Sequence, residues 1–68
     1  MSTAYYKQAV KCINQFVEDA DGNWHNAKID LDNWCVEVVA LDKIECFDAW
    51  NTFVHALDLA WAEMAPVE

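Results

Sequence analysis

The sequence predicts an α+β fold, a single small domain over residues 1–68 in the order α-β-β-α, with two helices packed on one face of a two-stranded antiparallel hairpin. Apolar and polar residues alternate on both sides of Asp32-Asn33, which is typical of strands joined by a tight turn. Before and after this stretch, apolar residues recur at helical spacing. A chain of 68 residues buries only about 60% of its unfolded surface, so a single small core is expected.

The first predicted element is a helix over residues 3–19. Its apolar residues return every three or four positions and form one stripe: Tyr6, Ala9, Val10, Ile13, Phe16, Val17 and Ala20. Ser2 or Thr3 is suited to cap its first turn. Gly22, the only glycine, is placed to end the helix in a left-handed conformation.

Two strands are predicted next, over residues 24–31 and 34–41, with Asp32 and Asn33 as the turn between them. This register puts six residues on the face toward the helices: Ala27, Ile29, Leu31, Trp34, Val36 and Val38. A slip of one residue would turn this face outward, so the register is well specified.

The outer face of the hairpin pairs Lys28 with Glu37, and opposite charges across two strands support a register. Trp24, Val39 and Leu41 form an apolar end on the same outer face. A sheet of two strands also has two open edges. The sequence therefore predicts a homodimer formed through the hairpin or through the overhanging end of the last helix.

The last predicted element is a helix over residues 43–64, followed by a frayed tail at 65–68. Asp42 and Glu45 have the spacing of a capping box at its start. Its apolar arc is wide enough to touch both the sheet and the first helix. The arc contains Cys46, Phe47, Trp50, Phe53, Val54, Leu57, Ala60, Trp61 and Met64.

The charge of the chain is strongly negative. Twelve acidic residues stand against four lysines, there is no arginine, and the net charge at pH 7 is −8. The first 17 residues contain Lys7 and Lys11 and no acid. Since binding phosphates requires Lys and Arg, direct contact with nucleic acid or an anionic membrane is not expected. A protein with a basic surface is the favoured partner.

Three cysteines without CxxC spacing favour reduced thiols and a cytoplasmic location. No secretion signal is expected, and no stretch of 18 apolar residues that would predict a membrane span occurs in the sequence. Asp19, Asp21 and Asn23 begin like a calcium loop, but Trp24 and Asp30 stand where that loop needs glycine and glutamate. A solvated turn is the better interpretation.

The sequence gives equally little support for a zinc site, a catalytic nucleophile or a pH-sensing histidine. No pair among the cysteines and histidines has the close spacing of a structural zinc site. A nucleophile built from Cys35, His25 and Asp30 fits poorly, because His25 and Cys35 fall on opposite sides of the predicted hairpin. His55 lies on the exposed side of the last helix, where a solvated residue is expected and a pH-sensing role is the alternative. The sequence predicts no enzyme activity, no cofactor and no metal.

The acidic residues are the main candidates for a functional site. Carboxylates three or four residues apart on a helix are about 5–6 Å apart, a spacing comparable to that of neighbouring phosphates along a DNA strand. Aromatic residues surrounded by acids would suit a partner that offers basic residues around an apolar pocket. The predicted partner-binding set is Asp30, Asp32, Glu37, Asp42, Glu45, Asp48, Trp24, Val39 and Leu41. The alternative is that the acids only keep a small apolar protein soluble.

In size, charge and lack of a catalytic motif, the whole chain resembles the small acidic inhibitors that phages and mobile elements make against host defence or nucleic-acid enzymes, such as anti-CRISPR and DNA-mimic proteins. The resemblance implies an inhibitor that occupies a basic nucleic-acid-binding surface of another protein. The alternative is a small homo-oligomeric accessory or structural protein, whose exposed apolar hairpin face is a subunit interface.

Overall fold

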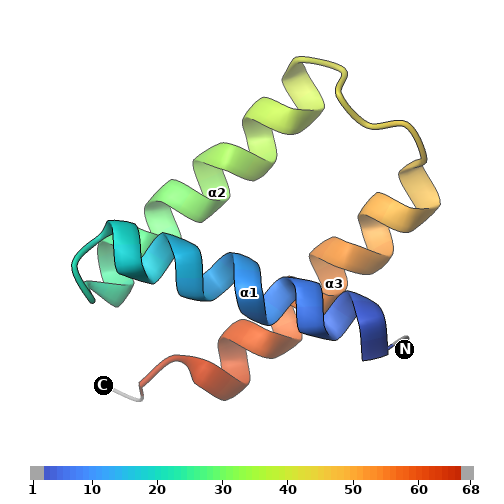
Figure 1. The fold of residues 1–68 in the computed structure, drawn as a ribbon. Helices are drawn as coiled ribbons and strands as arrows, with labels where there is room; N and C mark the ends of the chain where they lie inside the picture. Colours follow the sequence, from blue (N-terminus) through green and yellow to red (C-terminus); the bar gives the residue numbers. More distant parts are fainter. Residues whose placement is uncertain (1–2, 67–68) are drawn as a thin grey trace.

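The structure, a computed structural model, describes residues 3–66 and contains three helices. They are α1 (Thr3–Asp19), α2 (Trp24–Ala40) and α3 (Phe47–Met64), joined by a short turn and a longer loop (Figure 1). No strand occurs between residues 3 and 66, so the predicted α+β fold and its hairpin are wrong. The first helix has the bounds that the sequence predicted.

The helices form two layers. α1 packs across both α2 and α3, which run antiparallel to each other behind it (Figure 1). No Cα atom of α2 comes within 8 Å of one in α3, so the two helices pack against each other only through side chains. The molecule is correspondingly flat, with extents of 34 × 26 × 17 Å.

Residues 24–40 form a helix because their sequence contains the features of one. The side chain of Asn23 caps the first turn by accepting a hydrogen bond from the backbone N–H of Asn26 at 3.0 Å. Lys28 Nζ lies 2.9 Å from Asp32 Oδ1, four residues on, in place of the predicted pairing of Lys28 with Glu37. Between residues 24 and 40 neither glycine nor proline interrupts the pattern.

The inward face expected of the hairpin is only partly buried. Ala27 and Leu31 are buried, and Trp34 and Val38 lie on the same side of the helix, at spacings of three and four residues. These four residues fit a strand and a helix equally well. Ile29 and Val36, which the hairpin would have buried, are 47% and 67% exposed.

The capping box predicted at Asp42 and Glu45 does not form. Asp42 has φ 53° and ends α2, with Lys43 N–H bonded to the carbonyl of Val38 at 3.2 Å. The last helix begins at Phe47 and not at Lys43, and its N-cap, Cys46, makes no side-chain capping bond. A chain that has just completed one helix must turn before the next, so residues 41–46 form the connection.

The turn between α1 and α2 also contains residues with positive φ and a backbone hydrogen bond to the end of the preceding helix. Asp21 and Gly22 both have positive φ, 55° and 81°, and Gly22 N–H bonds to the carbonyl of Val17 at 2.8 Å. The left-handed conformation expected for Gly22 is confirmed. Two predictions fall outside the described residues: the capping of the first helix by Ser2, and the end of the tail at residues 67–68.

The buried core is thin. Four of its seven residues are alanines, and Ile13 is the only large side chain in the described residues that is fully buried. The buried set is Ala9, Ile13, Ala27, Leu31, Ala56, Leu57 and Ala60. Half-buried aromatic rings surround it and contribute packing of about 0.5–1.5 kcal/mol per ring pair.

One row of aromatic rings links all three helices. The ring centroids of Phe16 and Trp34 are 5.9 Å apart, those of Trp34 and Trp50 are 5.8 Å apart, and those of Trp50 and Phe53 are 6.0 Å apart. Because the backbones of α2 and α3 stay apart, the Trp34–Trp50 contact bridges the space between them.

None of the helices in the described part of the chain combines the length and the apolar character that crossing a membrane requires.

Replacing Ile13 with alanine should lower the free energy of unfolding by about 2–5 kcal/mol, because the side chain leaves a cavity in the core. Ile29→Ala is the matched control and should cost less than about 0.5 kcal/mol, because Ile29 lies on the surface. Urea unfolding followed by circular dichroism measures both. Equal losses at the two positions would contradict the helical fold, since only the hairpin buries Ile29.

Replacing Asp42 with glycine should raise the free energy of unfolding by about 0.5–1 kcal/mol. Glycine adopts the φ of 53° without strain, and the change removes a negative charge from the C-terminal end of a helix. Thermal unfolding measures the change as a rise of a few degrees in Tm. Asp30→Gly, inside α2, should instead lower Tm. A fall in Tm for Asp42→Gly would contradict the helix end described here.

Candidate partner-binding surface

All acidic side chains in the described part of the chain are exposed to solvent. Only Asp32 among them forms a salt bridge there, with Lys28. The exposed acids are Glu18, Asp19, Asp21, Asp30, Asp32, Glu37, Asp42, Glu45, Asp48, Asp58 and Glu63. Their charge is therefore available to a partner.

The predicted acids of α2 do not share one face. Asp30 and Glu37 are seven residues apart and lie within about 20° of each other around the helix axis, whereas Asp32 lies about 200° from Asp30. The hairpin had placed Asp30 and Asp32 together at its tip. On the helix they border two different sides of the molecule.

The other three predicted acids gather around the connection between α2 and α3. Asp42 ends α2, Glu45 lies in the loop, and Asp48 lies in the first turn of α3. At that position the carboxylate of Asp48 also interacts favourably with the helix dipole. We call residues 41–48 the acidic loop. It also carries two exposed apolar side chains, Leu41 at 61% and Phe47 at 60%.

The predicted apolar set of Trp24, Val39 and Leu41 is not one surface. Trp24 starts α2 and packs edge-on against Trp61, with ring centroids 5.3 Å apart. Val39 lies 15 residues further along, about 22 Å away on a helix. The hairpin pairing that would have placed Trp24 beside Leu41 does not exist.

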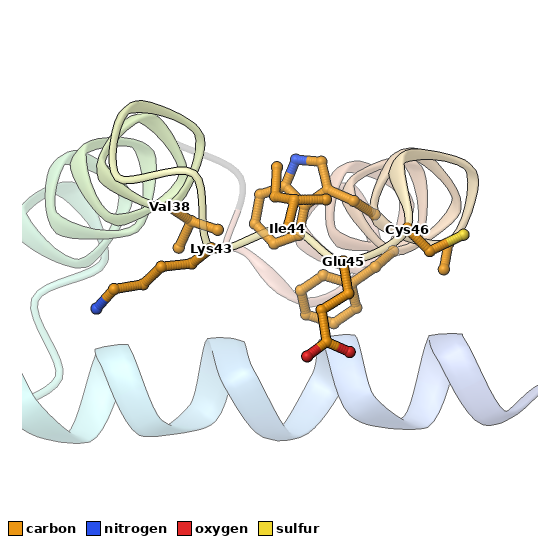
Figure 2. A pocket seen from close by; sticks show the side chains of 8 residues that line it. Val38, Lys43, Ile44, Glu45 and Cys46 are labelled. Atoms are coloured by element: carbon orange, nitrogen blue, oxygen red, sulfur yellow. The ribbon is translucent and has the colours of Figure 1, made fainter.

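A hollow of about 390 Å³ lies beneath the acidic loop, as Figure 2 shows from close by. Lys43, Ile44, Glu45 and Cys46 cross between the ends of α2 and α3, and the side chain of Glu45 points toward the side on which α1 lies. The lining residues are Val38, Lys43, Ile44, Glu45, Cys46, Ala49, Trp50 and Phe53.

A second hollow, which the sequence did not reveal, lies between α2 and α3. We call it the α2–α3 groove, and its volume is about 420 Å³. It is lined by Cys35, Val36, Val39, Ala40, Trp50 and Val54. A helical projection of residues 24–40 would have shown Val36 and Val39 outside the buried stripe, but only the placement of α3 makes them one wall of a groove.

The residues considered for metal binding and for nucleophilic chemistry do not lie close enough together to form a site. No group of three or more potential metal ligands forms among residues 3–66. In the candidate calcium segment, the side-chain oxygen of Asn23 instead caps α2. His25 and Cys35 are ten residues apart on one helix, about 15 Å along its axis. His55 is exposed on α3, as expected.

The chain matches no family model, no curated protein and no solved structure in comparisons with each.

The three cysteines should differ in reactivity. Burial raises the pKa of the Cys12 thiol, and burial together with the charge of Asp32 raises that of Cys35, whereas Cys46 is exposed. Because the thiolate is the reacting form, Cys46 should react with a disulfide reagent at pH 8 about tenfold faster than the other two. Stopped-flow absorbance measures the rates, and Cys46→Ser should remove the fast phase. Three equal rates in the folded protein would contradict this placement.

Proposed function

We propose that the protein is a non-enzymatic binding module that inhibits another protein by occupying its basic, nucleic-acid-binding surface. The observation that supports this most is that every acid in residues 3–66 is exposed to solvent, and only Asp32 among them is paired with a lysine. An acidic surface of this kind speeds association with a basic partner and discriminates against acidic ones.

The acidic loop is the proposed centre of contact. It combines Asp42, Glu45 and Asp48 with the exposed side chains of Leu41 and Phe47. Aromatic and aliphatic groups surrounded by charge form strong contacts when a partner removes them from water. A basic groove that normally holds phosphates would pair with the carboxylates.

A small homo-oligomeric accessory protein is the second candidate. The exposure of Ile29, Val36 and Val39 on α2 favours it, since a subunit interface would cover such side chains. The open sheet edges that predicted a homodimer are absent together with the hairpin. The two candidates differ in their dependence on salt, because an interface of aliphatic side chains is almost indifferent to it.

Neutralising the acidic loop tests the proposed function. The variant Asp42→Asn, Glu45→Gln, Asp48→Asn should weaken binding to the basic partner by at least about tenfold, because charge-assisted contacts are lost. The matched control removes the same charge at the other end of the molecule, through Glu18→Gln, Asp19→Asn and Asp21→Asn. Partners are captured from cell lysate at low salt, and their affinity for each variant is measured by calorimetry.

Captured proteins should bind nucleic acid and should lose it when this protein binds. Their affinity for this protein should fall steeply as the salt concentration rises. The proposal fails if both triple variants bind with the affinity of the natural chain. It also fails if duplex DNA or RNA does not compete with this protein for its partner.

A further inference from the structure

The α2–α3 groove lies on a different side of α2 from the residues that pack toward α1. Val36, Val39 and Ala40 are rotated by roughly 80–180° from the buried Leu31. Val36 is 67% exposed and Val39 is 51% exposed, so one wall of the groove is open to solvent. Its lining consists of aliphatic and tryptophan side chains and Cys35.

Carboxylates flank one end of this groove. Asp32 lies one turn before Val36 on α2, and Asp58 lies one turn after Val54 on α3. Both carboxylates are close enough to Cys35 for their charges to raise the pKa of its thiol, after the larger effect of burial. The groove therefore has an apolar centre and a carboxylate from each helix at one end. Asp32 is paired with Lys28, whereas Asp58 forms no salt bridge within residues 3–66.

The groove has the shape and periodicity that suit a helix. Its two walls are helices whose Cα atoms nowhere approach within 8 Å, and a third helix packs between two others at interaxial distances of about 8–10 Å. Phe47 lies seven residues before Val54 and extends the α3 wall at the end away from Asp58.

We propose that the α2–α3 groove binds an amphipathic basic helix of the partner protein. Apolar side chains of that helix would pack against Val36, Val39 and Trp50. Its lysines or arginines would face Asp58 and would share Asp32 with Lys28. This inference rests on the proposed function, because it takes the partner to be basic, and it adds a second contact that is separate from the acidic loop. Amphipathic helices bind apolar grooves through residues spaced three, four and seven apart.

Charge complementarity decides between this occupant and a second copy of the chain. Each copy carries a net charge of −8, so the association of two copies would have to overcome the repulsion between these charges, whereas a basic helix is attracted. The outward face of α1 offers no suitable stripe, because it carries Lys7, Lys11 and Asn14.

Three synthetic 18-residue peptides serve as probes. The first has a leucine stripe at helical spacing and lysines elsewhere. The second keeps the stripe and replaces each lysine with glutamate. The third keeps the lysines and replaces each leucine with serine. Binding to the full chain is measured by fluorescence anisotropy with labelled peptides.

The leucine–lysine peptide should bind at least about tenfold more tightly than either of the others. Val36→Ser with Val39→Ser should weaken that binding by about tenfold, whereas Leu59→Ser, at an exposed residue on the other side of α3, should leave it unchanged. Asp58→Asn should weaken it, and Asp30→Asn, on the other side of α2, should not. Circular dichroism checks the helix content of each variant, and the single change Val36→Ser replaces the double variant if the latter is unfolded.

Equal binding of the leucine–lysine and serine–lysine peptides, unaffected by the valine changes, would overturn the groove proposal and leave the acidic-loop proposal intact. Equal binding of the leucine–lysine and leucine–glutamate peptides would overturn the basic character of the occupant. Sedimentation that shows a dimer abolished by Val36→Ser with Val39→Ser would assign the groove to a second copy and overturn the proposal as well.

Discussion

The contact between Trp34 and Trp50 is the interaction on which the arrangement of α2 and α3 depends. These helices share no close backbone contact, and the buried core consists mostly of alanines. The two rings, 5.8 Å apart, bridge the space between the helices, and Phe16 joins them to α1. Trp50 also lines both the hollow beneath the acidic loop and the α2–α3 groove, so one side chain separates the two.

A core this small leaves much of the apolar content of the chain near the surface. Although 56% of the residues are hydrophobic, side chains as large as Phe47 and Leu41 are mostly exposed. Every acid in residues 3–66 is also exposed. Apolar contact area and negative charge therefore occur side by side, which is the combination expected of a protein that acts by binding.

The sequence predicted α1 correctly because its apolar residues fit only the helical period. It failed at residues 24–40 because Ala27, Leu31, Trp34 and Val38 fit two patterns. With a turn at residues 32–33 they fit the alternation of two strands, and without that turn they fit the helical period of 3.6. The exposure of the acids could be predicted from residue type alone. Their distribution over different sides of α2, and the α2–α3 groove, depend on the placement of whole helices and could not.

The most direct test is a titration of ¹⁵N-labelled protein with its captured basic partner, followed by NMR. The account predicts that amide shifts concentrate in residues 35–58, over the acidic loop and the two walls of the groove, and that they diminish as salt rises. Shifts confined to the outward face of α1, or a titration indifferent to salt, would contradict it.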